Sequence, residues 1–415
     1  MTTTRVAATA TINSNLYPRR PARHPFGGSF LIVIADMLTI ANIVDAVAFP
    51  FTVWRTLQGI EPEMQDGRPR YVTGNAAVSL PVRYQGRRYM LKCYTRPNDR
   101  LPAIYGEAFH SKELCVVDFA GRYHWVDCLL MEYVEGRSLD EVLCEATTEE
   151  EFSSLAREFD RMAGEILRSE RAHGDLKPEN IIVREDGSMV AIDWDAAFVP
   201  MFKGMRAVEI GTAAYQHPRR DTAFYDKHLD DYSVAFISTL LHFAALRPDV
   251  MEHYRQHREP PFTPVSLISG GRALTAALHT IVEEFARRGM AREYQVAMML
   301  GSQYVRLYDL AEVFSCKAMA VADLEGAELE MNDKGRWGVL LGEKWLLPPL
   351  YTSGIGLSEG VALMELGAYR HFVRLQDGVV LRSFSREENV GPLRDGCTRV
   401  RTADGEERII RVVVE

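Results

Sequence analysis

The chain has 415 residues, 47% of them hydrophobic and 25% charged, which is the composition of an ordinary globular protein long enough for two domains. This composition excludes collagen-like, coiled-coil and wholly disordered chains. The 57 acidic and 48 basic residues give a net charge of −9, so there is no basic surplus of the kind that nucleic-acid binding needs. The six cysteines form no Cys-x-x-Cys pair, which favours a reducing compartment, the cytoplasm, over a disulfide or zinc framework.

The N-terminus has four arginines and no acidic residue before Asp36. We expect residues 1–36 to be a flexible tail or an extension caused by a start assigned too early, because Met37 offers an internal start. An Arg-rich, acid-poor segment also suits a cleaved targeting peptide. The apolar stretch 30–54 is interrupted by Asp36, Asn42 and Asp45, and each charge at mid-bilayer costs about 2.5–3.5 kcal/mol. We therefore expect no membrane span, and instead a short helix that ends at Pro50.

The period of the hydrophobic pattern changes along the chain. Residues 70–95 alternate around Gln85-Gly86, which predicts a β-hairpin, and the apolar run 126–134 predicts another strand. From Ser138 to about residue 320 the apolar residues recur at helical spacing. A strand-rich part followed by a helix-rich part indicates an α+β body with two lobes.

The composition changes again after about residue 328. Short runs rich in Val, Ile and Leu are separated by turn sequences that contain Asp and Gly, a pattern typical of antiparallel strands. We therefore predict a small all-β domain at the C-terminus. The turn sequences are Asp333-Lys334-Gly335, Asp377-Gly378, Asp395-Gly396 and Asp404-Gly405.

The motif with the clearest chemistry is His173-Gly174-Asp175-Leu176-Lys177-Pro178-Glu179-Asn180. In phosphoryl transfer, one carboxylate orients the attacking hydroxyl and takes its proton, and a neutral oxygen ligand helps to hold magnesium. Asp175 and Asn180 have the types and the spacing for these two roles. A second metal-binding carboxylate is needed on the following hairpin. Asp193, thirteen residues after Asn180, stands where the kinase pattern places this carboxylate, whereas Asp186, six residues after Asn180, lies too close and fits the intervening turn.

These motifs resemble those of the protein kinase-like superfamily, and the resemblance extends in the right order over residues 70–250. It implies a bilobal kinase-like fold that binds ATP and Mg²⁺. By the same resemblance, Lys92 contacts the nucleotide phosphates. Its ion-pair partner on the following helix is expected to be Glu107, although Glu113 is also within reach.

Two further segments take their roles from the resemblance. The segment 130–136 resembles the hinge that binds adenine through backbone groups, here those of Glu132 and Tyr133. The phosphate-covering turn, residues 71–78, keeps one glycine, Gly74, where kinases often have three. This turn still allows the backbone to approach phosphates closely, but its clamp is expected to be looser.

Departures from the kinase pattern indicate an atypical, bacterial branch. Gly174 replaces the arginine that reads a phosphate on the activation segment, and Asp195 stands where the metal motif has glycine. Lys177 is typical of Ser/Thr kinases, in which its ammonium stabilises the transferring phosphoryl group. We therefore assign catalysis to Asp175 and Lys177 and favour a protein acceptor. Small-molecule phosphotransferases share His-Gly-Asp-Leu and the Asn at this spacing, so they remain an alternative.

The C-terminal segment carries a Trp337-Gly338 strand, then Pro348-Pro349-Leu350-Tyr351 and Ser358-Glu359-Gly360-Val361-Ala362. This order resembles one unit of the WG-repeat family. A single unit buries little core by itself, so we expect it to pack on a neighbour or on the kinase-like body.

These observations divide the chain into five parts: a tail (1–36), a helix with the N-lobe (37–135), a C-lobe (136–300), a helical linker (301–328) and a WG-repeat-like β domain (329–415). The first interpretation is an ATP- and Mg²⁺-dependent protein Ser/Thr kinase with a protein substrate and a β domain that binds a further protein. The alternatives are a pseudokinase scaffold, which binds a partner through that domain, and a small-molecule phosphotransferase.

Overall fold

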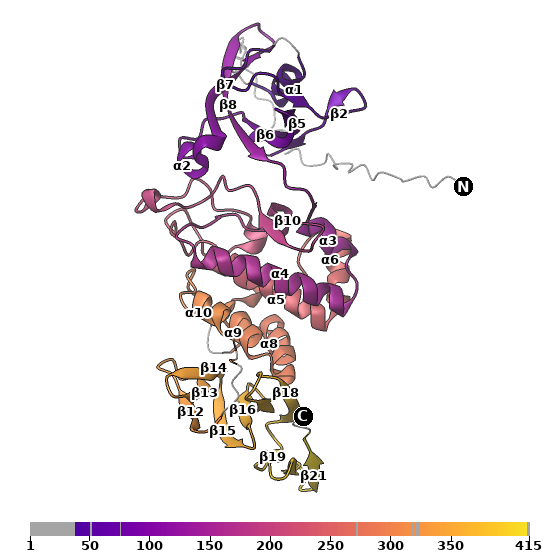
Figure 1. Ribbon diagram of the computed structural model, residues 1–415, viewed down its shortest axis with the longest axis vertical. Coiled ribbons are helices and arrows are strands. Elements are labelled where there is room, and N and C mark those ends of the chain that lie inside the picture. Colours follow the sequence, from indigo (N-terminus) through magenta and orange to yellow (C-terminus); the bar gives the residue numbers. More distant parts are fainter. Residues whose placement is uncertain are drawn as a thin grey trace, which may run out of the picture.

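The structure, a computed structural model, describes residues 38–49, 52–74, 76–270, 273–317, 319 and 324–412. The predicted tail 1–36 and Pro50 lie outside these residues. Three parts follow one another along the long axis of the molecule: a strand-rich N-lobe (38–132), a helical C-lobe (137–315) and a β tail (327–412) (Figure 1). The predicted two-lobed α+β architecture with a small all-β C-terminal part is confirmed.

The N-lobe is built on one antiparallel sheet with the strand order β1-β5-β6-β8-β7, in which β4 also pairs with β5. The predicted hairpin is β5–β6, and its turn residues Gln85 and Gly86 both have positive φ, as a two-residue hairpin turn requires. Helix α1 packs its apolar side, including Ile43, on this sheet. The elements are α1 (Ile40–Ala48), β1 (Glu61–Pro62), β2 (Met64–Gln65), β3 (Arg68–Pro69), β4 (Val72–Thr73), β5 (Ala77–Tyr84), β6 (Arg87–Tyr94), α2 (Leu101–Tyr105), β7 (Phe109–Val117) and β8 (Tyr123–Glu132).

The C-lobe is built around α5, which is buried along almost its whole length and packs on α4. Helix α4 begins at a capping box, in which Thr148 and Glu151 satisfy each other's backbone N–H groups, and it is amphipathic. The elements are β9 (Arg137–Ser138), α3 (Leu139–Glu145), α4 (Glu149–Arg168), β10 (Ile181–Val183), β11 (Met189–Ala191), α5 (Asp231–Leu246), α6 (Glu252–His257), α7 (Pro264–Leu267), α8 (Ala276–Arg288), α9 (Ala291–Met299) and α10 (Leu310–Ser315).

The β tail consists of three small antiparallel sheets, β12-β13-β14, β15-β16-β17-β18 and β19-β20-β21. The predicted Asp/Gly turns connect neighbouring strands, as at Asp377-Gly378 between β17 and β18. The strands are β12 (Ala327–Met331), β13 (Trp337–Leu341), β14 (Lys344–Tyr351), β15 (Ser353–Ser358), β16 (Val361–Leu366), β17 (Tyr369–Arg374), β18 (Val380–Ser385), β19 (Asn389–Val390), β20 (Cys397–Arg401) and β21 (Glu407–Arg411).

The β tail packs directly on the C-lobe. Buried residues of β14 and β16 belong to the same apolar core as those of α8 and α9. Gln295 on α9 donates to the carbonyl oxygen of Leu350 at 2.6 Å, and the Tyr369 hydroxyl donates to Glu283 on α8 at 2.8 Å. Of the described residues in the predicted linker 301–328, Leu310–Ser315 form the α-helix, and β12 already begins at Ala327.

Every helix in the described residues is too short or too polar to cross a lipid bilayer.

Candidate active site

The loop before β10 is held in place by its neighbours. Gly174 has φ +84°, and a Cβ at this position would lie 2.4 Å from the carbonyl oxygen of Ala196, so glycine is needed here. Asp230, beside the start of α5, accepts hydrogen bonds from the backbone N–H groups of His173 and Gly174. A ring nitrogen of His173 lies 2.7 Å from the carbonyl oxygen of Ile192. The backbone before Asp175 is therefore fixed from two sides.

Asp175 meets the segment that precedes Tyr215. Its Oδ1 accepts a hydrogen bond from the backbone N–H of Thr212 at 2.6 Å. Lys177 donates from Nζ to Thr212 Oγ1 at 3.0 Å and lies 3.5 Å from Asp175 Oδ2. Asn180 donates from its amide nitrogen to the carbonyl oxygen of Asp175 at 2.9 Å. The side chains of Asp175, Lys177, Thr212 and Asn180 thus form one connected group.

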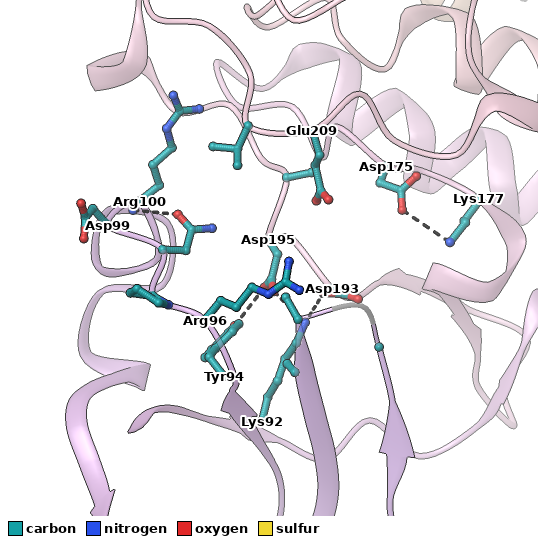
Figure 2. Close-up of a pocket in the computed structure, with 17 residues that line it drawn as sticks. Lys92, Tyr94, Arg96, Asp99, Arg100, Asp175, Lys177, Asp193, Asp195 and Glu209 are labelled. Carbon is teal, nitrogen blue, oxygen red and sulfur yellow. Dashed lines mark hydrogen bonds and ion pairs between the residues drawn. The ribbon is translucent and has the colours of Figure 1, made fainter. Parts of the chain in front are cut away.

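Lys92 extends from β6 of the N-lobe to two carboxylates of the C-lobe. Its Nζ lies 2.5 Å from Asp193 Oδ1 and 2.8 Å from Asp195 Oδ2 (Figure 2). Burial disfavours the charge on this ammonium, but the two carboxylates outweigh that effect and raise the pKa of Lys92. Lys92 is therefore charged in the fold and joins the two lobes.

Asp195 is bound by two tyrosines as well. Its Oδ1 accepts hydrogen bonds from Tyr94 at 3.0 Å and from Tyr105, on α2, at 2.7 Å. Burial first, and then the negative charge of Asp195, raise the pKa values of both phenols well above the usual range. Both hydroxyls therefore stay protonated and act as donors to this carboxylate.

The predicted ion pair between Lys92 and Glu107 is not formed in this structure. Helix α2 has five residues, and Glu107 lies after its end in a 3-10 turn with an exposed side chain. Glu113, the other candidate, is buried on β7 and accepts hydrogen bonds from the backbone N–H groups of Thr56 and Leu57, each at 2.7 Å. It therefore fixes the segment after α1 and is not a partner of Lys92.

A cavity of about 710 Å³ lies between the two lobes, and neither Asn180 nor Glu107 lines it. Five predicted site residues face it: Gly74, Lys92, Asp175, Lys177 and Asp193. Figure 2 shows Lys92 and Tyr94 rising from the same strand toward Asp193 and Asp195, with Glu209 on the opposite wall. The other lining residues are Ala76, Ala77, Tyr94, Arg96, Pro97, Asn98, Asp99, Arg100, Asp195, Ala196, Val208 and Glu209.

Comparison with protein families gives a match that covers one side of this cleft. Residues 120–198 match the ABC1 atypical kinase-like domain, which belongs to the protein kinase-like superfamily. The chain contains a protein kinase-like domain. The matched range includes β8, Asp175, Lys177, Asn180, Asp193 and Asp195. No curated protein matches the chain significantly.

Glu132 and Tyr133 lie where the N-lobe of the kinase-like domain passes into the C-lobe. The backbone N–H of Tyr133 donates to the carbonyl oxygen of Arg88 at 3.3 Å, and the Arg88 guanidinium lies 3.7 Å from the centre of the Tyr133 ring. Neither Glu132 nor Tyr133 lines the cavity. Their assignment as an adenine-binding hinge therefore stays a prediction.

The donor set of the kinase-like domain suits Mg²⁺ bound together with a phosphate ligand. Among the residues that the structure describes, no three His, Cys, Asp or Glu side chains converge as a metal site. Mg²⁺ commonly takes one or two carboxylates and completes its shell with water and substrate phosphates. Asp193 and Asn180 would supply a carboxylate and a carboxamide oxygen. The backbone N–H of Ile192 donates to the carbonyl oxygen of Asn180 at 2.8 Å, which brings Asp193 beside Asn180.

Sequence reasoning gave no role to Tyr94, Tyr105 or Asp195. Two signals were present. Tyr94 lies two residues after Lys92 on a strand and so shares its face. Asp195 lies two residues after Asp193, where a kinase has glycine, and a charged replacement at that position points to a charged partner.

Proposed function

We propose that the protein is an ATP- and Mg²⁺-dependent protein Ser/Thr kinase. The observation that carries this proposal is the group formed by Asp175, Lys177 and Thr212, in which the lysine bonds the threonine hydroxyl and the aspartate accepts the threonine backbone N–H. The group ties the acid–base residue to residues 211–218, Gly-Thr-Ala-Ala-Tyr-Gln-His-Pro, which resemble the kinase segment that closes the activation region and shapes a peptide platform. A small-molecule enzyme would not need this connection to a platform.

Each residue has a role that follows from its position. Asp175, with one oxygen bound to Thr212, is placed to orient an acceptor hydroxyl and to take its proton. Lys177 supplies positive charge beside it, where negative charge increases during transfer. Lys92 would hold the phosphates of ATP, and Asp193 and Asn180 would hold the metal. When bound, Mg²⁺ neutralises phosphate charge and ATP supplies the phosphoryl group.

A second candidate is a scaffold without catalysis. The observation that favours it is the phosphate-covering turn, which keeps one glycine, Gly74, where kinases often have three. In both candidates we propose that the β tail binds a protein partner. We also propose the cytoplasm as the compartment, because all six cysteines are free and Cys93 and Cys128 stay unbridged with their sulfur atoms 3.6 Å apart.

The test is a transfer assay with γ-labelled ATP and Mg²⁺ that compares the wild-type protein with Asp175→Asn. Asp175→Asn keeps the shape of the side chain and the acceptor oxygen for Thr212 but removes the base. The expected result is label on the protein itself or on an added protein, reduced about 10²–10⁴-fold in the variant.

Three other results would reject the proposal in different ways. ATP binding without transfer would favour the scaffold, and label on added metabolites alone would favour a small-molecule phosphotransferase. Equal transfer by Asp175→Asn and the wild type would remove Asp175 from catalysis.

A further inference from the structure

We propose that Asp195 is the positioning residue that holds Lys92 in the phosphate-binding place, the task that a glutamate on the helix after that strand performs in the kinase pattern. This inference rests on the proposed function, because it gives Lys92 its phosphate ligand. It assigns a role to a residue that stands outside the predicted metal and catalytic set.

The first argument is that every oxygen of Asp195 is committed. Oδ2 forms the 2.8 Å ion pair with Lys92, and Oδ1 accepts from both Tyr94 and Tyr105. Two phenol donors fix the carboxylate without neutralising it. Its full negative charge therefore remains available to Lys92, whose side chain is only 10% exposed.

The second argument is the difference between the two aspartates. The side chain of Asp193 is 45% exposed, whereas that of Asp195 is 22% exposed. Both aspartates line the cavity, but Asp193 is the one more open to a metal, and an aspartate that holds a metal has less charge to offer Lys92. Asp195 is then the acidic partner that still faces the ammonium.

The third argument is the short length of α2 and its contacts with the C-lobe. This helix is too short to bring Glu107 to Lys92, and it supplies Tyr105 to Asp195 instead. It is also tied to the C-lobe, because Arg171 donates to the carbonyl oxygen of Ile104 at 3.1 Å and Arg100 donates to that of Arg206 at 2.6 Å. The helix therefore acts on Lys92 through Asp195.

The first measurement needs no nucleotide. The full chain is methylated reductively with formaldehyde, and the rate at Lys92 is read by mass spectrometry for the wild type, Asp195→Asn and the matched control Glu107→Gln. Removing one charged hydrogen-bond partner corresponds to about a tenfold change in an equilibrium constant. The rate of methylation at Lys92 should therefore be about tenfold higher in Asp195→Asn than in the wild type. Glu107→Gln should react as the wild type does.

The second measurement is the Kd for ATP with Mg²⁺, determined by calorimetry on the same proteins. Asp195→Asn should weaken binding about tenfold, and Glu107→Gln should leave it unchanged. A smaller perturbation is Tyr105→Phe, which removes one donor to Asp195 and should weaken binding about threefold, with the exposed Tyr123→Phe as its control.

The outcomes separate the two proposals. Unchanged Lys92 reactivity in Asp195→Asn, or an equal increase in Glu107→Gln, would overturn the role of Asp195 whether or not the protein binds ATP. A wild type that binds no ATP would reject the proposed function, while the methylation rates would still decide the role of Asp195. If Asp195→Asn does not fold, Tyr105→Phe takes its place, and wild-type Lys92 reactivity in that folded variant would reject the proposal.

Discussion

The C-lobe has two boundaries, and they are built in opposite ways. Toward the N-lobe, the connection runs through polar contacts around a cavity, above all the ion pairs of Lys92 with Asp193 and Asp195. A small apolar cluster around Ile104 and Phe198 adds to them, and the main N-lobe core is separate. Toward the β tail, buried residues of both parts form one continuous core.

This difference separates function from stability. The ion pairs of Lys92 line a cavity, so a ligand that enters it can offer this ammonium other negatively charged partners. A shared apolar core cannot be opened without exposing the surface that stabilises both parts. We therefore expect substitutions at the boundary with the N-lobe to alter ligand binding. Substitutions at the boundary with the β tail should alter folding.

The largest expected effect follows removal of the β tail. A chain that lacks residues 327–415 should melt far below the full chain or aggregate, because the faces of α8 and α9 that share its core become exposed. The measurement is thermal unfolding followed by circular dichroism. The control lacks only residues 386–415 and keeps β12–β18, so its kinase-like part should melt near the full-length temperature. Equal melting of all three chains would show that the tail is an independent domain.

A single substitution tests the same boundary. Leu350→Ala, in the shared core, should lower the free energy of unfolding of the whole C-lobe by about 2–5 kcal/mol. Leu393→Ala removes an equally buried side chain from the separate cluster near β19–β21 and should loosen only that region in hydrogen exchange. Changes in hydrogen exchange in the same segments of both variants would show that the two clusters are not separate.

At the polar boundary the informative variant is Asp193→Asn. Asp193 has φ +63°, a conformation that asparagine also adopts readily, so the backbone should tolerate the change. With Mg²⁺ and ATP at 100 times Kd, a binding protein gains about 2.7 kcal/mol of stability, and the variant should lose this gain. Thermal shifts with and without nucleotide measure it. An undiminished shift in the variant would take Asp193 out of the metal site.

The parts of the fold that the sequence predicts are those that depend on local chemistry. The Gln85-Gly86 hairpin and the Asp/Gly turns of the tail were predicted because their φ values select these residue types. The catalytic loop was predicted from motif spacing, and five predicted site residues line one cavity. The identity of the tail as a WG-repeat unit stays a prediction.

The predicted ion pair between Lys92 and Glu107 was wrong, because it depends on the length of α2 and on where this helix packs. Spacing places Glu107 after Lys92 as in a kinase, but a helix of five residues ends before it can present that side chain. The substitute, Asp195, comes from a segment about a hundred residues away, and its tyrosine donors come from the strand of Lys92 and from α2. The spacing of Lys92 and Tyr94 and the charge at Asp195 hint at these contacts, but the sequence alone does not pair the residues, because the contacts arise from tertiary packing.

The smallest effect concerns His371, which is fully buried in the tail near the end of α8. Burial lowers the pKa of its imidazole to about 4. The Nδ1 atom of His371 forms a hydrogen bond with Ser383 Oγ at 2.8 Å. Below pH 6.5 the unfolded chain binds a proton that the folded chain refuses, so the stabilising effect is complete above pH 6.5 and is lost as the pH falls toward 4. At pH 5 the loss of unfolding free energy should be about 2 kcal/mol.

Denaturant unfolding at pH 7 and pH 5 measures this loss. His371→Gln should have a shallower pH dependence than the wild type, and His279→Gln, at an exposed site on α8, should keep the wild-type slope. Identical slopes in all three proteins would show that His371 does not couple acidification to the packing of the tail on the C-lobe.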